Sequence, residues 1–223
     1  MKKLGDWIIP DYDNPDKLKM VIEGKFQCDQ GLLTAFKYIK KFDNAIDVGA
    51  WIGDSSVIMA RHFKHVNLFE PVTEVADCCQ QNLIDREIKN YELFRVGLSN
   101  KSGKQILVNK GKSFSGWIST VDADNYNFKQ SFEIDTELLD NYKFTDIDFI
   151  KIDVDSHEGF LLEGAVDFFK NNSPVIMIES KERDQKKYQN PLMPHPIIFL
   201  EKIGYKVQEK AGKADYILTK VTM

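Results

Sequence analysis

Short apolar runs alternate with amphipathic segments along most of the chain. Five runs predict buried strands, and three of them end in an acid: residues 44–48, 65–70, 93–99 (a strand followed by a loop), 147–155 and 174–179. The segments between them carry apolar residues at helical spacing, as from Leu161 to Phe169. Strands that alternate with helices in this way are typical of parallel βαβ units. The pattern therefore predicts a doubly wound, mostly parallel α/β sheet.

The chain departs from this rhythm in two places. Residues 205–207 and 216–218 lie on either side of Gly212 and predict a closing antiparallel hairpin. Residues 100–135 hold short apolar runs and a glycine-serine loop, which we interpret as a β-hairpin insertion within a single domain of residues 1–223. The loop is either a surface hairpin or a set of substrate contacts: Ser113, Phe114, Ser115 and Trp117.

The beginning of the chain mixes aromatic and apolar residues with acids and prolines. We interpret residues 1–28 as an irregular N-terminal arm that packs against the domain. The alternative is a flap over the site, whose contacts would be Tyr12, Phe26 and Gln27.

Composition narrows the range of functions. With 223 residues, of which 43% are apolar, the chain can bury one sizeable core. It has no apolar run of about 18 residues, the length that a membrane span needs. Its three cysteines have no CxxC spacing, so we expect a reducing, cytoplasmic setting with neither a zinc site nor a disulfide framework. The net charge of −4 gives no general affinity for nucleic acid. The expected partner is therefore a small molecule, with neither nucleic acid nor a membrane involved.

Residues 44–56 form the stretch around which the site is predicted. They read as a buried strand, a turn bracketed by Gly49 and Gly53, and the start of a helix that Asp54 or Ser55 would cap. A glycine turn that opens into a helix lets a ligand approach backbone N–H groups closely. The stretch therefore predicts a nucleotide or nucleoside site.

Other strand ends add polar residues to the same site. In an open parallel sheet the ligand crevice lies beyond the carboxyl ends of the strands. Glu70 follows Asp47 by 70 − 47 = 23 residues and ends the next strand, where a carboxylate can accept both hydroxyls of a ribose. The segments that converge there are Asp47 to Gly53, Glu70, Gly97 to Ser99, Asp153 to Glu158, and Glu179.

Trp51 decides between the possible nucleotides. It stands where the dinucleotide fingerprint G-x-G-x-x-G has its second glycine, and its bulk would obstruct a pyrophosphate. S-adenosyl-L-methionine, an adenosine with an amino-acid tail, fits better. Asp47 and the glycine turn would address the tail, although Asp47 could instead cap the turn. Val72 and Leu98 would enclose the adenine.

Four segments resemble the FkbM-type methyltransferases: residues 45–53, 69–71, 97–100 and 149–154. That family consists of class I S-adenosylmethionine-dependent enzymes, mostly O-methyltransferases that act on sugars or natural products. The resemblance implies a Rossmann-like sheet of seven strands with the last strand antiparallel. It implies cofactor roles for Asp47, Gly49, Gly53, Glu70 and Pro71.

The sequence also differs from the family pattern at two positions. Trp51 stands where the family commonly has Asn, and Ser156 replaces a glycine of the Glu-Gly-x-Glu segment. The second difference suggests a loop that bends differently.

Methyl transfer to a hydroxyl needs alignment of the acceptor and a base for its proton. His157, Asp155 and Asp153 follow the strand that should end nearest the methyl group, and His157 or Asp155 is the expected base. His157 could instead cap the following helix or be merely exposed. A metal site formed by these residues with Glu179 is a further alternative that the family resemblance does not favour.

The sequence thus predicts an S-adenosyl-L-methionine-dependent O-methyltransferase for a hydroxylated small molecule or sugar. The alternatives are a dinucleotide-dependent oxidoreductase on a similar sheet and a non-catalytic nucleoside-binding protein. No metal is expected. The predicted cofactor contacts are Asp47, Gly49, Trp51, Gly53, Glu70, Pro71, Gly97, Leu98 and Asp153.

Overall fold

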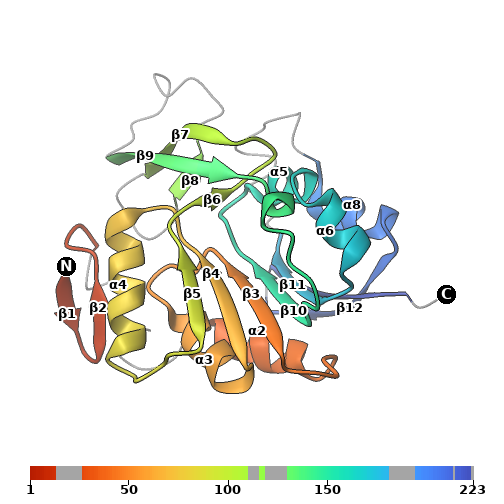
Figure 1. Cartoon of the computed structure of the whole chain (residues 1–223), viewed down its shortest axis with the longest axis horizontal. Helices are drawn as coiled ribbons and strands as arrows, with labels where there is room; N and C mark the ends of the chain where they lie inside the picture. The colour runs from red at the N-terminus through yellow and green to blue at the C-terminus, as the bar shows by residue number, and fades with distance from the viewer. Residues whose placement is uncertain (14–26, 110–115, 119–129, 181–193, 213, 222–223) are drawn as a thin grey trace.

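A seven-stranded sheet forms the centre of the computed structural model (Figure 1). The structure describes residues 1–13, 27–109, 116–118, 130–180, 194–212 and 214–221. The strand order is β12-β13-β11-β10-β3-β4-β5, and β13 alone in this sheet runs antiparallel to its neighbours. The predicted mostly parallel sheet with an antiparallel last strand is confirmed. Its strands are β3 (Asn44–Val48), β4 (His65–Phe69), β5 (Tyr91–Phe94), β10 (Phe149–Ile152), β11 (Val175–Glu179), β12 (Tyr205–Ala211) and β13 (Asp215–Lys220).

Helices cover both faces of the sheet because alternate strand residues point to opposite sides. Ala45 and Phe149 belong to one buried cluster, and their neighbours Ile46 and Ile150 belong to the other. The first cluster includes residues of α2 (Gln27–Phe36), α3 (Asp54–His62) and α4 (Thr73–Ile84). The second includes residues of α5 (Glu158–Glu163), α6 (Val166–Asn171) and α8 (Pro196–Lys202). The fold is therefore doubly wound, as predicted.

A second sheet lies across the first and begins earlier than the predicted insertion (Figure 1). Residues 93–99 were predicted as a strand followed by a loop, but the part expected as a loop contains a further short strand. The first part ends with β5 at Phe94, and Gly97 and Leu98 form β6, which pairs with Thr136 and Glu137 of the second sheet. The order of this sheet is β6 (Gly97–Leu98), β9 (Gln130–Glu137), β7 (Gly103–Asn109) and β8 (Gly116–Ile118).

The N-terminal arm also differs from its prediction. Residues 2–9 are not irregular but form an antiparallel hairpin of β1 (Lys2–Leu4) and β2 (Trp7–Ile9), which turns at Gly5 with a φ of 60°. The hairpin packs beside α4, as Figure 1 shows. The Asn82 side chain of α4 holds it by accepting a hydrogen bond from the Ile8 N–H (2.7 Å) and donating one to the Ile8 carbonyl (2.8 Å).

The single helix expected around residues 161–169 is two short helices, α5 and α6, with a break at Gly164. A short 3₁₀ turn (Leu139–Tyr142) lies before β10. A Cβ atom at position 164 would lie 2.0 Å from the carbonyl oxygen of Ser99, so the two backbones meet only because residue 164 is glycine. This contact brings the end of β6 beside the residues that follow β10.

Within the described residues, no helix is both long enough and apolar enough to cross a membrane.

Candidate functional site

A cavity opens where the carboxyl ends of β3, β4 and β10 meet the second sheet. Most of the predicted site residues line it: Gly49, Trp51, Glu70, Pro71, Gly97, Leu98, Asp153, Asp155 and His157. Val72, which was predicted to face the adenine, also lines it. Neither Asp47 nor Gly53 is among the described lining residues.

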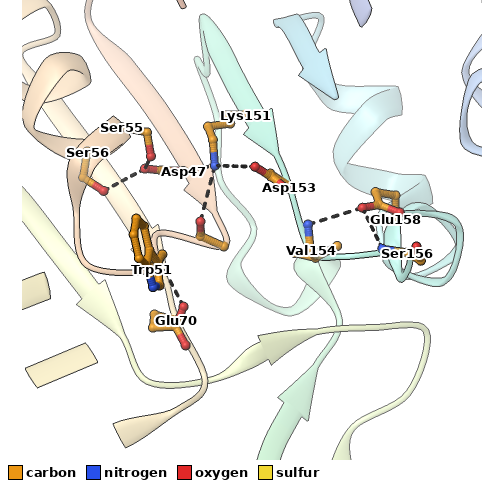
Figure 2. Close-up of polar contacts among 11 residues, drawn as sticks. Asp47, Trp51, Ser55, Ser56, Glu70, Lys151, Asp153, Val154, Ser156 and Glu158 are labelled. Atoms are coloured by element: carbon orange, nitrogen blue, oxygen red, sulfur yellow. Dashed lines mark hydrogen bonds and ion pairs between the residues drawn. The ribbon is translucent and has the colours of Figure 1, made fainter. Parts of the chain in front are cut away.

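An ion pair beneath the cavity joins the two central strands. The register of β3 and β10 places Lys151 directly beside Asp47, and both side chains are at least 95% buried. The Lys151 ammonium lies 3.2 Å from the Asp47 carboxylate and 3.8 Å from that of Asp153, and it donates to the Gly49 carbonyl at 3.3 Å. Figure 2 shows these contacts. Lys151 therefore links the glycine turn to the loop after β10.

The predicted contact of Asp47 with the methionine tail does not fit its surroundings. Its carboxylate is fully buried and accepts hydrogen bonds from the hydroxyls of Ser55 and Ser56, both at 2.7 Å, as well as from Lys151. The prediction that Asp54 or Ser55 caps α3 is also wrong, because the cap position is Gly53 and no side chain caps it. Asp47 holds the turn and the first turn of α3 from below.

Three residues of the glycine turn have left-handed backbones, which shape the floor of the cavity. A Cβ atom on Gly49 (φ 79°) would lie 1.9 Å from the Asp153 carbonyl oxygen, so only glycine fits there. Gly53 (φ 88°) faces Cys79 of α4 rather than the cavity. Trp51 has a φ of 49°, a conformation that favours glycine over a bulky residue. Trp51, which stands at the second glycine position of the G-x-G-x-x-G motif, thus has a backbone conformation that favours glycine.

Glu70 is oriented by the backbone on both sides. One carboxylate oxygen accepts the Trp51 N–H at 3.1 Å and the other accepts the Val72 N–H at 3.0 Å. Burial raises the pKa of Glu70 to about 7, against the effect of these two hydrogen bonds, and the charges of Asp155 and Asp47 raise it further. The side chain therefore presents a preorganised acid to the cavity.

The loop after β10 is bent by two successive left-handed residues, Asp155 (φ 49°) and Ser156 (φ 73°). Ser156 thus has a left-handed backbone, the conformation that a glycine adopts at no steric cost. The buried Glu158 carboxylate accepts hydrogen bonds from the N–H groups of Val154 (3.3 Å) and Ser156 (3.2 Å). Burial is the main cause that raises the pKa of Glu158 to about 7. Glu158 therefore organises the loop that carries the predicted catalytic residues.

His157 is buried at the wall of the cavity rather than exposed. Its Nε2 atom lies 2.9 Å from the Ser99 hydroxyl, and its backbone occupies the cap position of α5 without a side-chain cap bond. Burial lowers the pKa of His157 to about 4, with a contribution from the charge of Lys101. The imidazole is therefore neutral at pH 7.

Several candidates from the sequence lie outside the described residues or outside the described lining of the cavity. Phe26, Ser113, Phe114 and Ser115 lie outside the described residues, as do the side chains of Gln27 and Trp117. Glu179, at the end of β11, is not among the described lining residues. The described part of the chain contains no group of three acids, histidines or cysteines that could hold a metal ion.

Two residues around the cavity, Lys151 and Asp13, were not predicted from the sequence. Lys151 alternates with Asp153 on one strand face, a signal that was available. Ser99 belongs to the predicted segment Gly97 to Ser99, and its hydroxyl contacts His157. Asp13, which lines the cavity together with Tyr12, gave no signal because its position depends on how the N-terminal hairpin packs.

Comparison with known proteins identifies the family. Residues 47–207, well over half of the chain, match the family model described as the methyltransferase FkbM domain. The chain belongs to the FkbM methyltransferases. This family depends on S-adenosyl-L-methionine, as the resemblance implied. No curated protein matches the chain in sequence.

Solved structures share the fold of this FkbM chain at low sequence identity. An FkbM methyltransferase from Methylobacillus flagellatus is 16% identical with a TM-score of 0.53, and the match covers 96% of this chain but 56% of that one. A putative methyltransferase from Streptococcus mutans, crystallised with SAH, is 12% identical with a TM-score of 0.51, over 82% of this chain and 91% of that one. An S-adenosylmethionine-dependent O-methyltransferase from Thermotoga maritima is 13% identical with a TM-score of 0.51, over 97% and 73%. The chain spans little more than half of the first of these proteins.

Replacing Lys151 by methionine should destabilise the protein strongly, because it leaves the Asp47 carboxylate buried without its cation. The expected loss in the free energy of unfolding is about 3–5 kcal/mol. The double variant Lys151→Met with Asp47→Asn should lose less than the sum of the two single variants. Urea denaturation measures all of these free energies, with the exposed Lys104→Met as a control that should change little. Strict additivity of the two single effects would contradict a coupled pair.

Replacing Glu158 by glutamine should change how stability depends on pH. In the folded protein the Glu158 carboxyl group keeps its proton up to a pKa of about 7, whereas the ordinary pKa of a glutamate side chain is 4.5. The stability contributed by this group is therefore fully present below about pH 4.5 and is lost as the pH rises through 7.

Relative to wild type, Glu158→Gln should gain about 2–3 kcal/mol of unfolding free energy between pH 5 and pH 8. Urea denaturation at several pH values measures this difference. The exposed Glu163→Gln, on the same helix, is the matched control. An equal pH profile for wild type and Glu158→Gln would contradict the raised pKa.

Proposed function

We propose that this chain methylates a hydroxyl group of a small molecule or sugar with S-adenosyl-L-methionine as the donor. The observation that carries the proposal is the charge of the cavity. Its described lining contains four carboxylates, Asp13, Glu70, Asp153 and Asp155, and no lysine or arginine. A cationic sulfonium compound suits such a cavity, whereas the pyrophosphate of a dinucleotide would be repelled.

The residues present fit the donor at separate points along the cavity. Glu70 is placed to accept hydrogen bonds from the ribose hydroxyls, and its carboxylate is already oriented by two backbone N–H groups. Val72 and Leu98 offer apolar contacts for the base. The turn around Gly49 leaves its backbone open to the methionine tail, and Asp153 can contact the ammonium group of that tail.

Bound S-adenosyl-L-methionine supplies an activated methyl group, so the chain has to position the acceptor, exclude water and accept a proton. Two residues of the loop after β10 face the cavity for the last task. Asp155 is our candidate for the general base. His157 is the weaker candidate, because the Ser99 hydroxyl already contacts its Nε2 atom and its pKa is about 4.

The class of acceptor is inferred from the cavity and the relatives. The acidic lining disfavours a nucleic-acid phosphate backbone as the partner. The Thermotoga maritima relative is described as an O-methyltransferase, and its fold is shared by this chain. A neutral hydroxylated molecule is the acceptor that agrees with both observations.

Isothermal titration calorimetry tests the choice of cofactor. Wild type should bind S-adenosyl-L-methionine saturably and NAD not at all. Glu70→Ala should weaken this binding roughly 10- to 100-fold, because the ribose hydroxyls lose hydrogen bonds to a charged group. Glu92→Ala, an exposed acid on β5, is the matched control and should bind as wild type does. Saturable binding of NAD alone would refute the proposed function.

Turnover tests the proposed base. With a hydroxylated acceptor found in a panel of sugars and polyols, Asp155→Asn should lower kcat roughly 10²- to 10⁴-fold. Its affinity for S-adenosyl-L-methionine should change little. His157→Gln should have a smaller effect on kcat. Release of S-adenosylhomocysteine measures the rate, and a double variant as fast as wild type would exclude both residues as the base.

A further inference from the structure

The N-terminal hairpin carries Tyr12 and Asp13 to the end of the cavity beside α4. The Asp11 N–H donates to the Glu74 carboxylate at the start of α4 (2.9 Å), and the Lys2 ammonium donates to the Asp13 carbonyl (2.6 Å). The Asp11 bond attaches the segment to the first turn of α4, and the Asn82 contacts hold the hairpin against the last turn of the same helix. Both Tyr12 and Asp13 line the cavity.

The carboxyl group of Asp13 lacks a partner where one is expected. The residue is 4% exposed, and its Oδ2 atom is buried without a hydrogen bond. A buried polar atom that stays unpaired is costly, and such atoms in native structures call for an explanation. A ligand group in the cavity would provide the missing hydrogen bond.

The surroundings of Asp13 indicate what kind of group this is. Tyr12 and Phe132 lie with their ring centroids 5.6 Å apart, and both pack against the apolar cluster of Val72, Val75 and Ile134. These side chains line the cavity next to Asp13. A flat ring with apolar faces and one polar edge matches this combination of aromatic and aliphatic walls with a single carboxyl group.

Glu70 orders the parts of the ligand along the cavity. Glu70 lines the same cavity as Tyr12 and Asp13, which come from the N-terminal segment, and as Asp155, which comes from the loop after β10. If Glu70 holds the ribose and the methyl group lies toward Asp155, the base attached to the ribose extends toward Tyr12 and Asp13. In a nucleoside the base and the 5′ substituent leave the ribose on different sides, so this order is the one that the covalent structure requires.

We propose that Asp13 binds the adenine of S-adenosyl-L-methionine at its amino-bearing edge, with Oδ2 accepting a hydrogen bond from the exocyclic amine. This inference rests on the proposed function, since it assigns a further residue to the same cofactor. Burial raises the pKa of Asp13 to about 7, against the charge of Lys2 and together with that of Glu74. The protonated form can also donate to the neighbouring ring nitrogen.

Calorimetry with two ligands isolates this hydrogen bond. The ligands are S-adenosylhomocysteine and its analogue in which hydrogen replaces the 6-amino group of the purine. Wild type should bind the first roughly 10- to 100-fold more tightly. Asp13→Ala should lose the same factor for S-adenosylhomocysteine and bind the two ligands equally. The matched control is Asp6→Ala, an exposed acid in the turn of the same hairpin, which should keep the wild-type preference.

Thermal unfolding without ligand provides a second readout. Asp13→Ala should be at least as stable as wild type, because it removes an unpaired buried carboxyl group. Should it fail to fold, Asp13→Val replaces it: its side chain has no oxygen that can accept from the amine, so the two ligands should bind equally.

Two results would overturn the inference in different ways. An unchanged preference for the 6-amino ligand in Asp13→Ala would show that Asp13 does not contact the base, while the cofactor assignment stands. Failure of wild type to bind S-adenosylhomocysteine at all would refute the proposed function together with this inference.

Discussion

The buried ion pair between Lys151 and Asp47 is the interaction on which the site depends. Two charges can lie in the interior only if they are paired and hydrogen-bonded, and here the register of β3 and β10 places them side by side. Ser55 and Ser56 bring the start of α3 to the same carboxylate, and Lys151 reaches the carbonyl of Gly49. One polar cluster thus sets the position of the turn, the first helix and the loop after β10.

Above this cluster, the cavity gathers acidic side chains, and its described lining holds no lysine or arginine. Glu70 and Glu158 are buried, and each has a pKa raised to about 7 because desolvation opposes ionisation. Backbone N–H groups compensate for part of this cost. A cationic ligand would compensate for more of it, so the acidic lining gives the sulfonium donor a physical advantage over a phosphate compound.

Much of the fold could be predicted from the order of apolar runs, because buried parallel strands and their helices have distinct periods. The second strand within residues 93–99 could not be predicted. Both β5 and β6 contain apolar residues, and only their pairing with different sheets separates them. The N-terminal hairpin was missed for a related reason. Its three-residue strands are too short for a period, and they are stabilised by the distant Asn82.

The sequence by itself determined which chemical groups stand at the strand ends, because a strand followed by a turn places its last polar residue at the sheet edge. On that basis Glu70 and residues 153–158 were predicted at the site, and Glu70, Asp153, Asp155 and His157 line the cavity. Only the tertiary structure decided that Asp47 lies beneath the turn while Asp13 lines the cavity. The position of Asp47 depends on Lys151 from the neighbouring strand, and the position of Asp13 depends on a hairpin attached to α4. Both depend on contacts between residues far apart in the chain, which local patterns do not contain.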